Sequence, residues 1–147
     1  MAIPDRFEVW VVDTKAANFE LVVNSVPDSA HLILRHMPSA EEFLEQLHKR
    51  ASDIEKVVPQ IILIDFFLGE TFANDILPQI NEMFEFADLF RKPYIVAFSS
   101  MPNANTALLN LGAQWDILKI KDAEKIKEIE DLIGTKDAIV KQLGLTA

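Results

Sequence analysis

Gln60-Ile61-Ile62-Leu63-Ile64-Asp65 is the stretch of sequence that decides the fold. An unbroken run of branched apolar residues predicts a strand that is buried on both faces, as in a parallel sheet covered by helices. A carboxylate closes this run. Since open α/β sheets bind ligands at the carboxyl ends of their strands, Asp65 is the first candidate functional residue.

Other predicted strands also end in a reactive side chain. These side chains are Asp13 after Val12, Ser99 after Phe98 and Lys119 after Leu118. Because the carboxyl ends of parallel strands lie at one edge of a sheet, we expect all of these side chains to share a site with Asp65. Ser100 and Lys121 are the competing residues for the last two positions.

Strand and helix patterns alternate along the whole chain. The expected strands are 7–12, 31–35, a third ending at Asp65, 94–98 and 116–118. The expected helices lie around 19–26 and over 40–51, 74–90, 103–111 and 126–133, with a last turn or two within 136–143. A Ser39–Glu42 capping box begins the second helix, and Gly112 ends the fourth. Pro78 is expected in the first turn of the third helix. The pattern predicts an α/β fold: a doubly wound, five-stranded parallel sheet in a three-layer α/β/α sandwich, with the flavodoxin-like strand order 2-1-3-4-5.

The bulk properties limit the class of protein. The 147 residues suit one domain over 1–147, and no apolar stretch reaches the roughly 20 residues of a membrane span. The net charge of −9 and the lack of basic runs argue against nucleic-acid binding. There is no cysteine and no signal-peptide pattern at the N-terminus. We therefore expect a cytoplasmic protein with no membrane or nucleic-acid partner.

The residues at the strand ends suit phosphoryl chemistry. Two carboxylates placed close together, Asp13 and Asp65, repel each other unless a cation or a proton lies between them. Mg²⁺ is the natural cation, because it binds one or two carboxylates together with water and phosphate oxygens. An aspartate in this position can attack phosphorus and form an acyl phosphate.

The four strand-end residues resemble the signature of response-regulator receiver domains of two-component signalling. They are Asp13 in Val11-Val12-Asp13, Asp65 in Ile64-Asp65-Phe66-Phe67-Leu68, Ser99 in Phe98-Ser99-Ser100, and Lys119 after Gly112-Ala113. The resemblance covers nearly the whole chain. It implies a phosphoacceptor signalling domain rather than an enzyme, with at most slow self-dephosphorylation. The residues after Lys119 suffice only for the final helix, so we expect a stand-alone receiver that signals by protein contact.

The resemblance also implies a role for each site residue. Asp65 would take a phosphoryl group from a phosphohistidine on a sensor histidine kinase or phosphotransfer protein. Asp13, Asp65 and the backbone carbonyl of Phe67 would hold Mg²⁺. Ser99 and Lys119 would contact the phosphoryl oxygens and report their presence to a downstream protein target.

The sequence departs from the receiver pattern at three positions, which makes it partly degenerate. Thr14 replaces the second of two adjacent acids, so Mg²⁺ affinity should fall. Asp116 replaces the switch aromatic, and its neighbour Trp115 points to the other face of a regular strand. Ile120 replaces a proline that usually follows a cis peptide. A cis bond at Ile120 would cost about 2.5–4 kcal/mol, so a trans bond is expected.

Other functions remain open. The first alternative is a degenerate receiver that acts as a phosphorylation-independent interaction module. The second is an aspartyl phosphatase of the haloacid-dehalogenase type, but its Asp-x-Asp loop is absent, because Phe67 stands where the second acid would be. Asp13 could also be a simple helix N-cap. His31, His36 and His48 show no metal-ligand spacing and are interpreted as structural or solvated.

Overall fold

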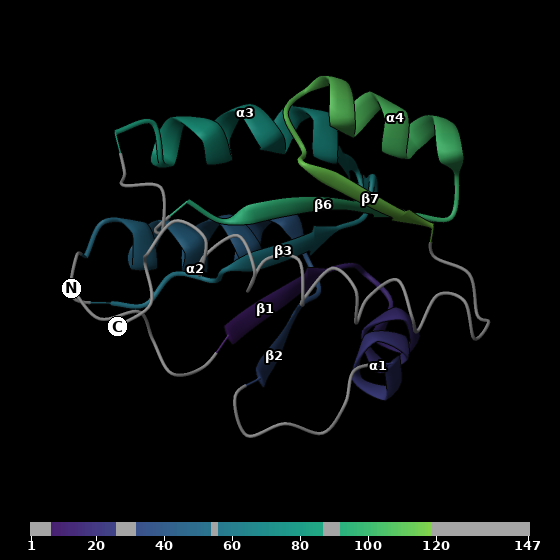
Figure 1. Cartoon of the computed structure of the whole chain (residues 1–147), viewed down its shortest axis with the longest axis horizontal. Coiled ribbons are helices and arrows are strands. Elements are labelled where there is room, and N and C mark those ends of the chain that lie inside the picture. The colour runs from purple at the N-terminus through teal and green to yellow at the C-terminus, as the bar shows by residue number, and fades with distance from the viewer. Residues whose placement is uncertain (1–6, 26–31, 54–55, 87–91, 119–147) are drawn as a thin grey trace, which may run out of the picture.

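A central parallel sheet organises the computed structural model, which describes residues 7–25, 32–53, 56–86 and 92–118 (Figure 1). The elements are β1 (Phe7–Val12), α1 (Ala16–Ser25), β2 (Leu32–Met37), α2 (Ala40–Ala51), β3 (Ile61–Ile64), β4 (Phe67–Leu68), β5 (Thr71–Phe72), α3 (Ala73–Met83), β6 (Tyr94–Ser99), α4 (Pro102–Asn110) and β7 (Trp115–Leu118). The five-stranded sheet has the order β2-β1-β3-β6-β7, and all its pairs are parallel. This order confirms the predicted 2-1-3-4-5 arrangement.

The sheet separates two clusters of buried apolar side chains. One face carries Trp10, Ile62 and Ile64, which pack with buried residues of α2, α3 and α4. The other face carries Val11, Leu63 and their neighbours, which pack with Val22 of α1. Figure 1 shows α3 and α4 on one side of the sheet and α1 on the other. No helix in the described part of the chain is long and apolar enough to cross a membrane.

The ends of the second strand and of the third helix differ from the prediction. The second strand extends to Met37 rather than Arg35, because all of β1 pairs with it, from Phe7↔Leu32 to Val12↔Met37. The third helix ends at Met83 rather than Phe90. Phe84, which caps this helix, is its last buried apolar residue, and Phe86 is 94% exposed.

Pro78 lies in the interior of α3 and not in its first turn, so this prediction was wrong. The pyrrolidine ring removes one intrahelical hydrogen bond to the carbonyl of Asn74. Both residues are exposed, so water can bond that carbonyl. The helix continues because its other face packs Ile76, Leu77 and Ile80 into the core.

Several smaller expectations are confirmed. The Ser39 side chain accepts a hydrogen bond from the backbone of Glu42 (3.1 Å) and caps α2. Gly112 has φ +111°, which suits a glycine after the end of α4. The predicted helices over 126–133 and 136–143 lie outside the described residues, as do His31, Lys119, Ile120 and Lys121.

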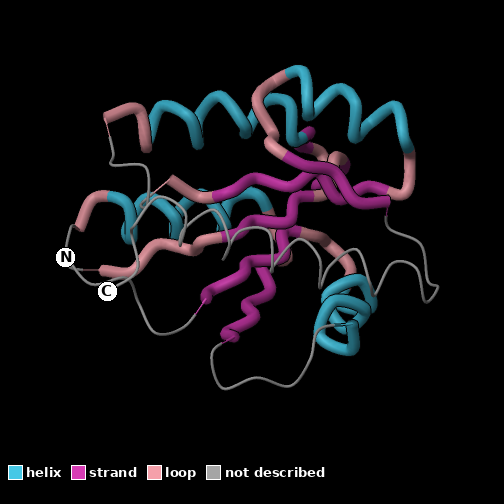
Figure 2. Tube along the Cα trace, in the orientation of Figure 1, coloured by secondary structure: helices cyan, strands magenta, loops and turns pink. Residues whose placement is uncertain are grey.

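A short antiparallel hairpin, which the sequence analysis did not foresee, follows Asp65 directly. It is formed by β4 and β5, with Phe67 opposite Phe72, and joins β3 to α3 (Figure 2). Gly69 begins its two-residue loop with φ +71°, a conformation that tight hairpin turns require. The hairpin holds the residues after Asp65 in a fixed path.

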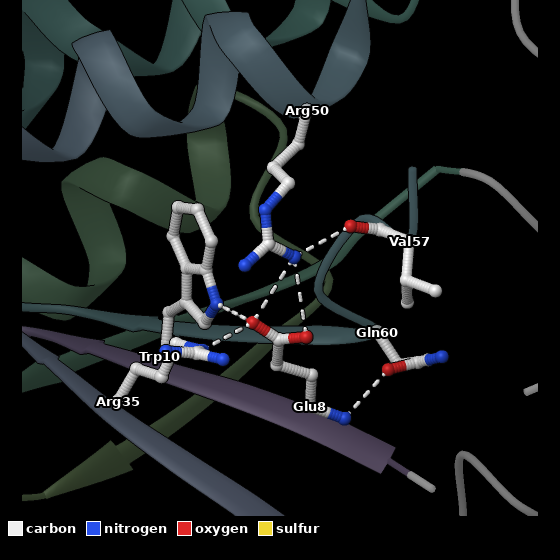
Figure 3. A network of polar contacts seen from close by, with 6 residues as sticks. All are labelled: Glu8, Trp10, Arg35, Arg50, Val57 and Gln60. Atoms are coloured by element: carbon white, nitrogen blue, oxygen red, sulfur yellow. Dashed lines mark hydrogen bonds and ion pairs between the residues drawn. The ribbon is translucent and has the colours of Figure 1, made fainter. Parts of the chain in front are cut away.

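Glu8 lies at the amino end of β1 and anchors a network of polar contacts (Figure 3). Its carboxylate accepts hydrogen bonds from Trp10 Nε1 (2.8 Å), Arg35 Nε (2.7 Å) and an Arg50 guanidinium nitrogen (3.3 Å). The Gln60 side chain accepts from the Glu8 backbone N–H (2.7 Å). Burial alone would raise the pKa of Glu8. The hydrogen bond from Trp10, the charge of Arg50 and the hydrogen bonds from Arg50 and Arg35 outweigh it and hold the pKa below its ordinary value.

Glu8→Gln should lower the free energy of unfolding at pH 7 by about 1–3 kcal/mol, because charged hydrogen bonds to both arginines are lost. A carboxylate with a lowered folded pKa stabilises the protein above its unfolded pKa of about 4.3, and this contribution disappears as the pH falls through the folded value. The difference in the free energy of unfolding between wild type and Glu8→Gln should therefore become smaller below about pH 4. Urea unfolding across this pH range measures it.

Glu45→Gln is the matched control for the Glu8 variant. Glu45 pairs with Lys49 at 3.2 Å, but both side chains are more than half exposed. An exposed pair of this kind contributes less than about 1 kcal/mol. If Glu8→Gln and Glu45→Gln gave the same unfolding curves at every pH, the assigned role of the Glu8 network would be wrong.

Candidate functional site

The sheet register brings the predicted site residues to one edge. Val12 pairs with Ile64, and Ile64 pairs with Ala97, so β1, β3 and β6 end close together. The backbone N–H of Asp65 donates to the carbonyl of Val12 (2.9 Å), which extends this ladder by one residue. Asp13, Asp65 and Ser99 therefore leave neighbouring strands at the same edge.

A cavity of about 370 Å³ opens at this edge. The residues that line it are Thr14, Lys15, Asn18, Asp65, Phe67, Gly69, Ser99, Ser100 and Met101. Of the predicted site residues, Asp65, Phe67 and Ser99 thus share one cavity, whereas Asp13 is not among its lining residues. Lys119 follows β7 and lies outside the described residues.

Asp65 and Phe67 reach the cavity from the β3–β4 connection. One carboxylate oxygen of Asp65 accepts a hydrogen bond from the N–H of Phe66 (2.8 Å). The side chain of Phe67 is 45% exposed and packs edge-on against Phe72, with ring centroids 5.7 Å apart. The hairpin therefore fixes the backbone that carries both residues and leaves an aromatic ring at the rim of the cavity.

Asp13 is completely buried beside the cavity. Its Oδ1 accepts hydrogen bonds from the backbone N–H of Lys15 (2.9 Å) and from Nδ2 of Asn18 (3.0 Å), which also lies 3.1 Å from Oδ2. Its backbone carbonyl accepts from Nε2 of His36 (2.7 Å), whose ring stacks on Phe19. These contacts give Asp13 a role at the start of α1, and they give His36 a structural role.

Ser99 is held in place by Asn105, a fully buried residue of α4. Oδ1 of Asn105 accepts from the Ser99 N–H (2.9 Å), and Nδ2 donates to the carbonyls of Ser99 and Ile117 (both 3.2 Å). Oγ of Ser99 accepts from the N–H of Met101 (3.1 Å). The Ser99 hydroxyl therefore keeps its own hydrogen to donate to another acceptor. Ser100, the competing serine, also lines the cavity and is exposed.

The donors at the cavity fit a hydrated Mg²⁺ ion. The described residues contain no group of three acidic, histidine or cysteine ligands. Mg²⁺ does not need such a group, because it usually keeps several waters and binds one or two carboxylates. The Asp65 carboxylate, the Phe67 carbonyl and the Thr14 hydroxyl are all oxygen donors of cavity-lining residues.

Comparisons with known proteins support one fold family. No sequence-family model and no curated protein sequence matches the chain. Solved structures of receiver domains do match the chain. One is the signal receiver domain of a protein described as a Luxo repressor from Vibrio parahaemolyticus, which is 18% identical to this chain. The match has a TM-score of 0.69 and covers 95% of this chain and 96% of the other. The chain has a receiver fold.

Two further receiver structures resemble the chain. The phosphorylated cyanobacterial phytochrome response regulator RcpA is 15% identical with a TM-score of 0.68, and the Mn²⁺-bound form of response regulator Rcp1 is 18% identical with a TM-score of 0.66. Each match covers 86% of this chain and 91% of the other. The likeness thus extends over most of the receiver fold, at a sequence identity too low to transfer residue roles.

The departures from the receiver pattern have clear positions in the fold. Thr14, which is expected where receivers carry a second acid, lines the cavity. β7 pairs with β6 in regular register, Val96↔Trp115 and Ala97↔Asp116, with no bulge. Trp115 and Asp116 therefore point to opposite faces of the sheet, and Trp115 does not take over the position of the switch aromatic.

The sequence analysis missed several residues of the site. Lys15 and Asn18 line the cavity, and Asn105 positions Ser99. Lys15 directly follows Thr14, so its closeness to Asp13 in sequence was a usable signal. Asn105 offered none, because an asparagine in a short helix is usually solvated.

Proposed function

We propose that the chain is a single-domain, cytoplasmic response regulator. In this proposal Asp65 receives a phosphoryl group from a histidine kinase or phosphotransfer protein, and the phosphorylated domain signals by contact with a downstream protein. The observation that supports this proposal most directly is that Asp65 lines a cavity together with Ser99 and Phe67, at the carboxyl edge of a receiver-like sheet.

The transfer would proceed by attack of an Asp65 carboxylate oxygen on the phosphorus of a phosphohistidine. A P–O bond forms while the P–N bond breaks. The electron pair of the broken bond stays on the imidazole nitrogen, which takes up a proton. The product is an acyl phosphate on Asp65 and a free histidine.

The other residues would stabilise the charge on the phosphoryl oxygens. The Ser99 hydroxyl can donate to one oxygen, since its Oγ already accepts from Met101. Lys119 is proposed to pair with another. Mg²⁺, held by the Asp65 carboxylate and the Phe67 carbonyl with the charge of Asp13 nearby, would offset the negative charge when bound. Asp13 is proposed as a further ligand through one of its carboxylate oxygens, which also accept hydrogen bonds from Lys15 and Asn18.

Incubation with acetyl phosphate and Mg²⁺ tests the proposal. We expect the intact mass to rise by one phosphoryl group, and the adduct to disappear at alkaline pH, as an acyl phosphate should. The absence of an adduct, together with no binding of beryllofluoride, would instead support the interaction-module alternative. The regular register of β7, which leaves Asp116 in the switch position, is the observation that favours that alternative.

A further inference from the structure

Lys15 is the cation that the described structure places at the cavity. It lines the cavity together with Asp65, Ser99 and Ser100. Its side chain forms no ion pair with another residue of the described ranges. Asp65 is the one acidic residue that lines the cavity within those ranges. A lysine thus lines the same cavity as the carboxylate that is proposed to be phosphorylated.

The backbone of Lys15 is fixed at both of its polar groups. Its N–H donates to the buried Asp13 carboxylate (2.9 Å), and its carbonyl accepts from the N–H of Asn18 (3.1 Å). Asn18 closes this arrangement, because its side-chain amide donates to the same carboxylate. The buried Asp13 therefore acts on the backbone that carries Lys15 as well as adding charge to the site.

We propose that Lys15 binds the phosphoryl group, or another tetrahedral anion, at the Asp65 cavity, and that Asp13 is the residue that positions it. This inference rests on the proposed function and adds an anion-binding residue to it. Phosphate oxygens accept charge-assisted hydrogen bonds from a lysine ammonium, which are roughly twice as strong as hydrogen bonds between neutral groups. Lys15 thereby supplies positive charge at a site where Thr14 has removed a carboxylate and so weakened the hold on a metal ion.

The proposal gives Lys15 opposite effects on the two kinds of ion. Its ammonium attracts the anion and repels Mg²⁺, because like charges at short range disfavour each other. Lys15→Gln should therefore weaken beryllofluoride binding by about tenfold, the loss of one charged hydrogen bond. The same substitution should tighten binding of Mg²⁺ alone by about threefold. If Lys15 had only a structural role, its substitution would weaken the binding of both beryllofluoride and Mg²⁺.

Isothermal titration of the full chain measures both affinities, with Mg²⁺ alone and then with beryllofluoride at saturating Mg²⁺. Lys49→Gln is the matched control, because it removes the same charge from an exposed lysine of α2. Lys15→Arg should keep beryllofluoride binding near the wild-type value. Opposite shifts in Lys15→Gln support the proposal. Unchanged affinities, or a parallel loss of both, overturn it while leaving the phosphoacceptor function intact.

If the wild-type protein forms no adduct with acetyl phosphate and binds no beryllofluoride, the proposed phosphoacceptor function is rejected. A separate measurement then tests Lys15 alone. Binding of inorganic phosphate is then compared between Asp65→Asn and the double variant Asp65→Asn/Lys15→Gln, in which the repelling carboxylate is absent. A drop of about tenfold in the double variant keeps Lys15 as an anion-binding residue. Equal phosphate affinities overturn that assignment.

Discussion

Asp65→Asn should abolish the phosphoryl adduct that acetyl phosphate forms on the wild-type protein. A carboxamide cannot act as the nucleophile toward phosphorus, so the loss should be complete within the detection limit of intact-mass measurement. The fold should survive. The Asn side-chain oxygen can accept the same hydrogen bond from Phe66 N–H that Asp65 Oδ1 accepts at 2.8 Å.

Asp75→Asn is the control for this experiment, because Asp75 is an exposed acid in the first turn of α3 and does not line the cavity. It should form the adduct as wild type does. Thermal unfolding of both variants should match wild type closely. An adduct that persists in Asp65→Asn would place the nucleophile on another side chain, and peptide mapping would then locate it.

Asn105→Leu should produce the largest loss of stability among the variants considered, about 2–4 kcal/mol. The substitution removes a fully buried side chain that bonds the Ser99 N–H and two strand carbonyls. An apolar side chain of similar size leaves the Ser99 N–H without that partner inside the core, and an unmade bond of this kind carries the full desolvation cost. Such a loss is a large share of the 5–15 kcal/mol that is usual for a domain.

The same variant should also slow adduct formation on Asp65, because Asn105 fixes the backbone from which the Ser99 hydroxyl reaches the cavity. Urea unfolding and the rate of adduct formation measure the two effects. Thr106→Ala provides the comparison, since Thr106 is exposed and bonds only the carbonyl of Pro102 within its own helix (3.0 Å). If Asn105→Leu were as stable as Thr106→Ala, the bonds of Asn105 would not be stabilising the strand end.

The sheet could be predicted from the sequence because its strands are short apolar runs. Ile61–Ile64 is buried at every position, and a strand buried on both faces leaves an unbroken apolar signature. The strand ends also follow from this pattern, so the sequence alone predicts that Asp65 and Ser99 lie at one edge of the sheet. The ends of β2 were harder to place, because pairing with β1 and not hydrophobicity extends it to Met37.

Other features depend on contacts that no local pattern encodes. The β4–β5 hairpin has two residues in each strand, too few to show alternation, and only Gly69 at the start of its loop marked the turn. Asn18, five residues further along the chain, donates a hydrogen bond to Asp13, which is buried and does not line the cavity. Sequence spacing could bring two acids to one edge, but it could not show which of them a neighbouring amide holds.

Glu8 lies near the start of β1 and Asp13 directly follows its last residue, and this separation has a practical consequence. They stand at opposite ends of β1, about 17 Å apart along an extended chain. Substitutions more than about 7–10 Å apart that share no partner usually have independent effects. The residues described above as bonding Glu8 are different from those that bond Asp13. A substitution at Glu8 should therefore change the pH dependence of folding stability without changing the affinity of the cavity for anions. A substitution near Asp13 should change the anion affinity without changing that pH dependence.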